Sequence, residues 1–344
     1  MFKLFSLLFY ITPNWIYKII FFNRPHIRNF YIDAKSFALI KIIEKLRKTN
    51  LSDLKENEIP NFRSEVESLK SIVRLKISKK KEIRREDIFL KDSRIQLRRY
   101  IPSKLESSKT ILYFHGGGYV LNSIDTHDEL VSYMSSKMGV EIFSLNYSLS
   151  PENKFPIQVN QAYEALKEIE SRSISMSNVS LCGDSAGGHL ALSLTNKLIE
   201  DNQPLPGNQF LIYPMLDPMM ETESYELFKK NFFLTKDTME WFWRCFRNND
   251  ADNEDKKFNI MKTNECLELY PETHIVTAGF DPLCDEAEEF LFMLNENGVK
   301  VRQLHYPRLF HGFANVGILS EAKNALDDFL SEYQNSSSLS GSQL

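Results

Sequence analysis

From about residue 110 onwards, the chain alternates between two hydrophobic patterns. Short runs in which nearly every position is apolar alternate with longer segments whose apolar residues recur every three or four positions. The first pattern indicates buried β-strands and the second indicates amphipathic helices. Strands are predicted at residues 110–114, 140–146, 179–182, 209–213, 274–278 and 300–306, and helices at residues 129–138, 158–169, 189–200, 286–295 and 321–333. This alternation predicts an α/β fold, with a parallel sheet between two layers of helices.

Before residue 110 the hydrophobic pattern does not alternate regularly between strands and helices. Residues 83–90 and 95–101 alternate as strands do and are predicted to form a hairpin that turns at residues 91–93. Residues 29–48 have helical spacing. Residues 51–63 are polar and contain Pro60, so a linker is predicted there.

The domain organisation follows from two interruptions. Residues 217–264 are too long for an ordinary crossover and are predicted to form a cap insertion together with N-terminal cap helices in residues 1–80. The catalytic domain is then predicted at residues 81–334, and the serine-rich tail at 335–344 is predicted to be disordered.

The N-terminal residues 1–22 are rich in Phe, Ile and Leu. No small-residue cleavage site follows them, which argues against a signal peptide. A membrane span is also disfavoured, because Pro13, Asn14 and Lys18 interrupt a stretch that would need about 20 apolar residues. Two interpretations stay open: a pair of short helices over the mouth of the active site, or attachment to a membrane surface.

The bulk composition limits the function classes. The chain has 344 residues and a formal net charge of −4, so we expect no nucleic-acid partner. Four cysteines without a C-x-x-C pair argue against a disulfide framework or a zinc site, and favour a reducing, cytoplasmic location. No metal or cofactor is expected, and a homodimer is left open. The basic run at residues 79–85 is either a lipid-headgroup site or a solvated edge of the sheet.

The segment that carries most chemical information is the strand at 179–182 followed by Gly183-Asp184-Ser185-Ala186-Gly187 and then a helix. A serine hydroxyl attacks well only when it is exposed beside a base, and a tight strand-to-helix turn with glycines on either side presents it in that way. Ser185 is therefore the predicted nucleophile. The start of the helix would also offer the N–H of Ala186 to a reacting oxygen.

A second glycine-rich segment, His115-Gly116-Gly117-Gly118, directly follows the strand at 110–114. Such a loop can present backbone N–H groups to the oxygen of a carbonyl that gains charge. Gly116 and Gly117, with Ala186, are the predicted oxyanion-hole donors. His115 is expected to brace the loop.

A base and an orienting acid are found after two later strands. Asp281 follows the strand at 274–278, and His311 follows the strand at 300–306. The chain order Ser185, Asp281, His311 and the position of each residue beyond a strand end fit a catalytic triad. In that triad His311 would take the proton of Ser185, and Asp281 would orient the imidazole.

The other candidate residues are expected to have structural roles. Asp184 is expected to serve the turn, Asp285 and Glu286 to begin a helix, His305 to be packed in a strand, and Cys182 to fill the core. His26, His127, His189 and His274 show no metal-ligand spacing.

These segments together resemble the hormone-sensitive-lipase-like esterases (bacterial family IV) of the α/β-hydrolase superfamily. The matching runs are the H-G-G-G at residues 115–118, the G-D-S-A-G-G at 183–188, Asp281-Pro282-Leu283 and His311-Gly312-Phe313, with a looser match at 147–156. The resemblance implies an α/β-hydrolase fold with a mostly parallel eight-stranded sheet, flanking helices and a helical cap. It also implies hydrolysis of esters with short- to medium-chain acyl groups.

Three functions are compatible with these residues. The first is a carboxylic ester hydrolase that works through an acyl-enzyme. The second is a non-catalytic receptor for a small molecule, which the presence of His311 beside Ser185 and Asp281 disfavours. The third keeps the chemistry but changes the substrate, to an amide or to acyl transfer, and the sequence does not separate it from the first.

Overall fold

The computed structural model describes residues 8–9, 11–46, 54–73 and 83–339, and its centre is one sheet of eight strands. The order across the sheet is β10-β9-β8-β7-β5-β6-β4-β3. Strands β5 to β10 are parallel, whereas β4 runs antiparallel to both β3 and β6. The strands are β3 (Ile83–Phe89), β4 (Gln96–Pro102), β5 (Thr110–Phe114), β6 (Glu141–Leu145), β7 (Val179–Asp184), β8 (Asn208–Ile212), β9 (Glu272–Phe280) and β10 (Val301–Phe310). The predicted hairpin and the predicted parallel strands are confirmed.

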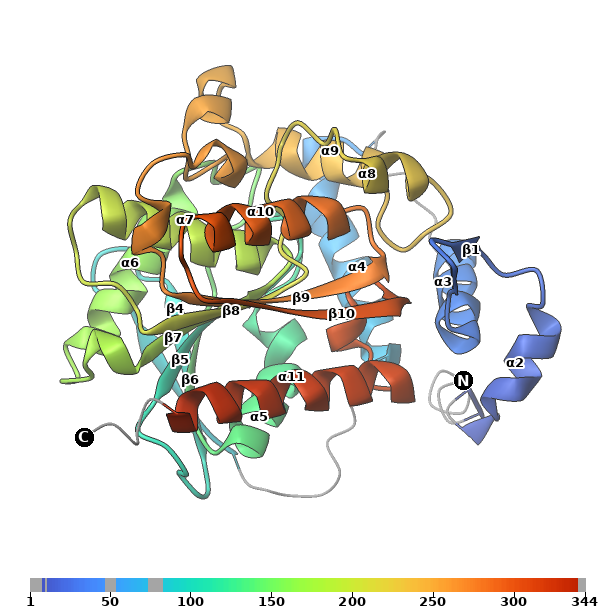
Figure 1. Cartoon of the computed structure of the whole chain (residues 1–344), viewed down its shortest axis with the longest axis horizontal. Helices are drawn as coiled ribbons and strands as arrows, with labels where there is room; N and C mark the ends of the chain where they lie inside the picture. The colour runs from blue at the N-terminus through green and yellow to red at the C-terminus, as the bar shows by residue number, and fades with distance from the viewer. Residues whose placement is uncertain (1–7, 10, 47–53, 74–82, 340–344) are drawn as a thin grey trace.

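Helices cover both faces of this sheet (Figure 1). One face carries α6 (Ile157–Glu170), α7 (Ala186–Glu200) and α10 (Cys284–Glu296), and the other carries α5 (Ile124–Met138) and α11 (Ser320–Leu339). Alternate side chains of β5 enter the two cores, since Leu112 packs with the α7 side and Ile111 with the α5 side. The α/β-hydrolase fold class is thereby confirmed, with both sheet faces buried as a parallel sheet requires.

Two groups of elements lie outside this three-layer body. The N-terminal group comprises α2 (Asn14–Ile20), β1 (His26–Ile27), β2 (Phe30–Tyr31), α3 (Ala34–Leu46), η2 (Glu56–Glu58) and α4 (Ile59–Val73). The second group comprises α8 (Glu223–Leu227), α9 (Lys236–Phe246) and the short 3₁₀ turns η4 (Asp250–Glu254), η5 (Ile260–Lys262) and η6 (Leu267–Leu269). Two more 3₁₀ turns, η3 (Met176–Asn178) and η7 (Phe313–Asn315), lie in loops of the main body.

The N-terminal group is attached to the body near the ends of β9 and β10 (Figure 1). The N–H of Asp33 donates to the carbonyl of Arg308 at 3.0 Å. Arg28 forms ion pairs with Asp285 at the start of α10 and with Glu223 on α8. Arg28 therefore joins the N-terminal segment to both the catalytic body and the second group.

Two predictions about loops are wrong. Residues 51–63 do not form only a linker, because α4 begins at Ile59 and places Pro60 in its first turn, where a missing N–H costs nothing. The C-terminal residues 335–339 are not disordered, because α11 ends at Leu339. Residues 340–344 lie outside the described residues.

The basic run at residues 79–85 is only partly described, since residues 74–82 are not. Within the described part, Arg84 pairs with Glu86 and Arg85 with Asp128, both on or beside the edge strand β3. These pairs suit a solvated edge that discourages pairing with another strand.

Candidate active site

The turn between β7 and α7 holds Ser185 in a strained conformation. Its φ is 56° and its ψ is −119°, values that a residue with a side chain seldom adopts. The backbone N–H of Ser185 donates to the carbonyl of Ile212 on β8 at 2.9 Å, which fixes the turn to the neighbouring strand. Strain of this kind persists only where the surrounding structure enforces it.

The glycines on either side of Ser185 are needed for close packing. A Cβ on Gly187 would lie 1.9 Å from the carbonyl oxygen of Phe114, and one on Gly183 would lie 2.4 Å from the backbone of Gly187. The start of α7 therefore rests directly against the end of β5. This contact brings the turn next to the glycine-rich loop that follows β5.

The three residues proposed as a triad from the sequence lie together in one hydrogen-bonded row. The imidazole Nε2 of His311 is 3.0 Å from Oγ of Ser185. Its Nδ1 is 2.7 Å from Oδ2 of Asp281. Ser185 is 8% exposed and His311 is 6% exposed, whereas Asp281 is fully buried. Among these three residues, Asp281 is therefore shielded from solvent, and only Ser185 and His311 are in part accessible to it.

Neighbouring groups fix the carboxylate of Asp281 and the imidazole of His311. Oδ1 of Asp281 accepts the N–H of Leu283 at 2.9 Å, so the carboxylate is fixed by its own loop. The ring of Tyr213 packs against the His311 ring with centroids 4.6 Å apart. Because both partners are fixed, little reorganisation is needed for the histidine to exchange a proton with the serine.

The two other acids near Asp281 are occupied elsewhere. Asp285 accepts hydrogen bonds from Arg28 and from the N–H of Ser224. Glu286 is fully buried and accepts the N–H of Leu216 at 2.7 Å, and its burial raises the pKa of this carboxyl well above the usual range. Both acids fasten α10 to the segments beside it.

The glycine-rich loop differs from its prediction at Gly116. The N–H of Gly116 donates to Oδ1 of Asp184 at 2.9 Å. The assignment of Gly116 as an oxyanion-hole donor is therefore wrong, because its only backbone hydrogen is already in use. Asp184 also accepts the hydroxyl of Tyr113 at 2.6 Å, which anchors this carboxylate beneath the loop.

The remaining glycines of the loop have free donors. Within the described residues, the N–H groups of Gly117, Gly118 and Ala186 make no hydrogen bond. The sequence-based assignment included Gly117 and Ala186 but not Gly118, whose N–H is also free. No local signal separates Gly116 from Gly118, since the difference is made by Asp184, 68 residues away in the chain.

His115 lies under the loop, as expected for a bracing residue. Its ring stacks on that of Tyr147 with centroids 4.2 Å apart, and the hydroxyl of Tyr147 donates to the His115 carbonyl at 2.6 Å. His115 is fully buried, and it is His311 whose ring contacts Oγ of Ser185.

Aromatic residues from the second outer group cover the site. A Cβ on Gly118 would lie 2.1 Å from the ring of Phe242 on α9, so this ring rests on the loop itself. Phe233 lies near Gly312, the residue after His311. Helix α4 is fixed over the same region, because Arg63 donates to the carbonyls of Val120 and Ser150 at 2.7 Å. Apolar rings and an anchored helix therefore lie beside the glycine-rich loop and the residue after His311.

Comparison with known proteins agrees with the fold. Residues 111–315 match the family model described as alpha/beta hydrolase fold. The chain is 30% identical to the vegetative-specific protein H5 of Dictyostelium discoideum over 303 residues, which is 83% of this chain and 88% of that protein. It is 31% identical to an ethyl acetate hydrolase of Pseudomonas putida over 222 residues, covering 63% of this chain and 70% of that one.

A solved structure extends the likeness to nearly the whole chain. The thermostable esterase from Pseudomonas putida ECU1011 superposes with a TM-score of 0.79 at 26% identity, covering 87% of this chain and 96% of that one. The chain belongs to the α/β-hydrolase family, and the resemblance to its hormone-sensitive-lipase-like branch is confirmed. Within that family it is an enzyme of the carboxylic ester hydrolase class.

Proposed function

We propose that the enzyme cleaves carboxylic esters by acyl transfer to Ser185. His311 removes the hydroxyl proton of Ser185 as Oγ attacks the ester carbonyl carbon, and a tetrahedral intermediate forms. The 3.0 Å contact between Oγ and Nε2 supports this step, because a base must lie within hydrogen-bond reach of its proton. This contact is the observation that carries the proposal.

The intermediate then collapses to an acyl-enzyme. The carbon–oxygen bond to the alcohol breaks, and the alcohol leaves with the proton from His311. In the second half a water molecule attacks the acyl carbon and gives a proton to the same nitrogen. The acid product is released as that proton returns to Ser185. Asp281 holds the ring so that Nδ1 keeps its hydrogen and stabilises the imidazolium.

The oxyanion formed in both halves would be bound by the N–H groups of Gly117, Gly118 and Ala186. All three donors are free, and they flank Ser185 from the loop and from the helix start. Fixed donors of this kind need no reorganisation when charge develops on the oxygen.

The substrate we propose is an ester with a short to medium acyl chain. Phe242 rests on Gly118 and limits the space directly beside the proposed oxyanion site. The ethyl acetate hydrolase among the relatives is, by its name, active on such a small ester. A cap of aromatic rings favours apolar acyl or alcohol groups over charged ones.

A series of nitrophenyl esters from acetate to palmitate, with wild type and Ser185→Ala, tests this function. The expected result is a peak at short to medium chains, and a loss on the order of a million-fold in the alanine variant. An early burst of nitrophenol would show acyl-enzyme formation. Substantial turnover by the Ser185→Ala variant would refute the nucleophile, and a peak at the longest chains would refute the substrate class.

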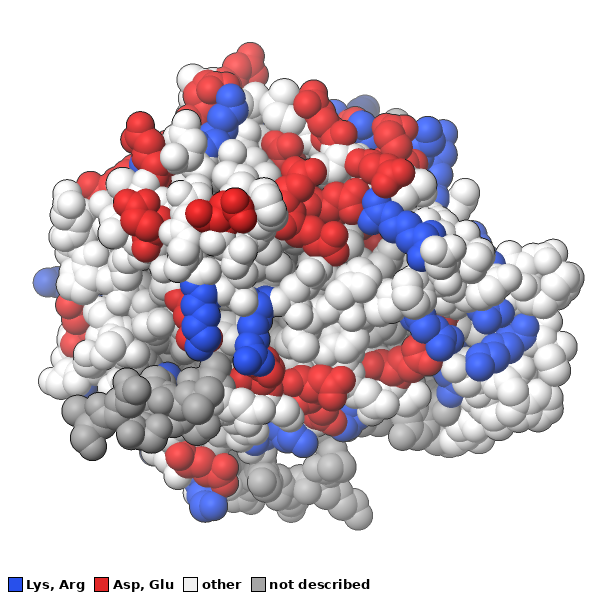
Figure 2. Space-filling view, in the orientation of Figure 1, with Lys and Arg blue, Asp and Glu red and all other residues white. Residues whose placement is uncertain are grey.

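We further infer that the N-terminal segment contacts a membrane surface. Exposed large apolar side chains gather there: Leu8, Ile11, Trp15, Ile19, Ile20 and Phe22. The sequence has no acidic residue before Asp33, but it has Lys3, Lys18, Arg24 and Arg28. Figure 2 shows this lobe as mostly uncharged, with lysine and arginine on it. Apolar groups flanked by cations suit an anionic lipid surface.

In the described residues, no helix has the length and apolar character needed to cross a bilayer. The inferred contact is therefore one that lies on the surface. The segment adjoins the body near the ends of β9 and β10, on the side where the triad lies. A lipid surface there would bring apolar esters close to the entrance.

Vesicle flotation with two matched variants tests this contact. Ile19 and Phe292 are both 65% exposed, but Phe292 is on α10, away from the segment. Ile19→Asp should weaken binding to vesicles with anionic lipid at least fivefold, whereas Phe292→Asp should not. Equal binding by both variants, or concentration-dependent dimerisation through this patch in ultracentrifugation, would contradict a membrane partner.

A cytoplasmic location is proposed on separate grounds. All four cysteines are free, and Cys182, Cys245 and Cys284 are buried. Free thiols are typical of a reducing compartment.

A further inference from the structure

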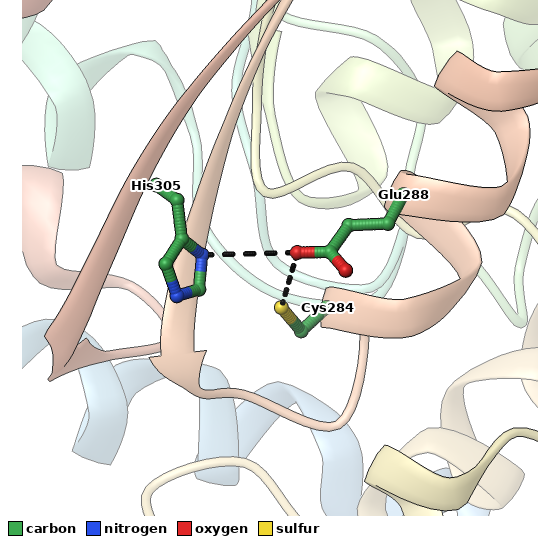
Figure 3. Close-up of side chains that lie close together, drawn as sticks. All are labelled: Cys284, Glu288 and His305. Carbon is green, nitrogen blue, oxygen red and sulfur yellow. Dashed lines mark hydrogen bonds and ion pairs between the residues drawn. The ribbon is translucent and has the colours of Figure 1, made fainter. Parts of the chain in front are cut away.

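A group of ligand-type side chains lies between α10 and the edge strand β10 (Figure 3). Cys284 begins α10, Glu288 follows one turn later, and His305 comes from the neighbouring strand β10. Sγ of Cys284 is 3.6 Å from Oε1 of Glu288, and Nδ1 of His305 is 3.9 Å from the same oxygen. One ligand atom from each residue lies within 4.8 Å of the others.

The fold explains why these residues meet. Cys284 and Glu288 are four positions apart and so share one face of the helix. Helix α10 packs on β9 and β10, and His305 is paired in register with Thr277 of β9. The sequence analysis expected His305 to be packed, which is wrong, because β10 is the edge strand and leaves this side chain 37% exposed.

The distances are close to those of a metal site. A tetrahedral Zn²⁺ has bonds of about 2.0–2.3 Å, which place its ligand atoms roughly 3.3–3.8 Å apart. Two of the contacts here are already 3.6 and 3.9 Å. Rotation of exposed side chains can close the remainder, since Glu288 and His305 reach the site from the solvent side.

Hydrogen bonds from neighbouring side chains fix the positions of His305 and Glu288. Nε2 of Gln303 donates to Oγ1 of Thr277 and to Oε1 of Glu288, each at 2.8 Å. Oγ1 of Thr277 lies 2.9 Å from Nδ1 of His305, and a cation bound at this nitrogen would replace the contact with Thr277, because the nitrogen has a single lone pair. A cation placed between this nitrogen and Oε1 of Glu288, which are 3.9 Å apart, would be bound by both.

The thiol completes the set. Cys284 would bind the cation as a thiolate. Binding would replace the thiol hydrogen by a metal–sulfur bond and release that proton to water. Thiolate, imidazole and carboxylate together are the ligand types that zinc prefers.

We propose that Cys284, Glu288 and His305 bind a divalent cation of the zinc type, with water as a fourth ligand. The ion would fasten the start of α10 to β10. Cys284 is three residues after Asp281, so the same ion would stiffen the loop that holds the proposed orienting acid. The site is thus a regulatory or stabilising one, and it does not depend on the proposed function.

Metal binding by the full chain, stripped with a chelator, tests the proposal. Zn²⁺ should bind with a stoichiometry of one, and Co²⁺ should give the near-ultraviolet absorption of a thiolate–cobalt bond. Cys284→Ser should abolish that absorption, and Glu288→Gln and His305→Gln should each weaken Zn²⁺ binding at least tenfold. Zn²⁺ should also raise the Tm of the wild type but not of His305→Gln.

Cys266→Ser is the matched control, because Cys266 is the exposed free cysteine and lies outside the cluster. It should leave binding and absorption unchanged. Binding lost in Cys266→Ser, binding equal in wild type and His305→Gln, or no binding at all would each overturn the proposal. The surface variants Glu288→Gln and His305→Gln keep the test decisive if Cys284→Ser fails to fold.

Discussion

Two glycine-rich turns meet at the active site, and their glycines act in different ways. In the turn around Ser185 the glycines are required by local packing, as the 1.9 Å approach of a Cβ on Gly187 to Phe114 shows. In the loop at residues 116–118 the glycines differ in the state of their N–H groups. Asp184 accepts the N–H of Gly116, whereas those of Gly117 and Gly118 are free. A local motif therefore defines the shape of a turn, but distant residues decide which of its hydrogen-bond donors remain available.

The largest loss of activity is expected when His311, the proposed base beside Ser185, is replaced. His311→Gln removes the group that accepts the Ser185 proton, and kcat should fall on the order of a million-fold, as in another serine enzyme that lost its histidine. Steady-state kinetics on nitrophenyl acetate measure this loss. A fall of less than about a hundredfold, within the range of a single general base or less, would mean that another group activates the serine.

Asp281→Asn should have the next largest effect. The amide can keep the contact with Nδ1 but favours the wrong tautomer of His311, so kcat should fall about ten-thousandfold with little change in fold. Circular dichroism provides the control for folding. Near-normal activity in this variant would assign the orienting role to a different acid.

The loop at residues 116–118 is tested through Asp184, which accepts the N–H of Gly116. Asp184→Ala leaves the N–H of Gly116 and the hydroxyl of Tyr113 without their acceptor and should move the loop, with a loss of kcat on the order of a hundredfold. Asp184→Asn keeps an acceptor and should lose much less. If both variants were equally active, Asp184 would not position the donors.

The smallest expected effect is on selectivity. Phe242→Ala removes the ring that rests on Gly118 and should shift the preferred acyl chain by two or more carbons, with a several-fold gain for longer esters. The ratio of kcat/KM between octanoate and acetate esters measures the shift. An unchanged ratio would place the acyl group on the other side of the serine.

The alternation of strands and helices was predictable because buried parallel strands are apolar throughout and their helices are amphipathic. The positions of Ser185, Asp281 and His311 followed from the rule that such sheets gather their chemistry at the carboxyl ends of strands. Both inferences use patterns that lie within a few residues of each site.

Other features depend on contacts that no local pattern encodes. The start of the helix at Ile59–Val73 was not predicted because proline usually ends a helix, but Pro60 lies in the first turn, where proline is tolerated. The role of Gly116 was set by Asp184, and the cluster of Cys284, Glu288 and His305 by the packing of α10 on β10. For Gly116 and for the cluster, the deciding partner is distant in the sequence.

The most direct test of the central claim is to trap the nucleophile. A nitrophenyl phosphonate ester that carries a short alkyl group should modify one residue per chain, and peptide mass spectrometry should place the adduct on Ser185. His311→Gln should slow that modification by several orders of magnitude. An adduct on another residue, or labelling of Ser185 at the same rate without His311, would contradict the account.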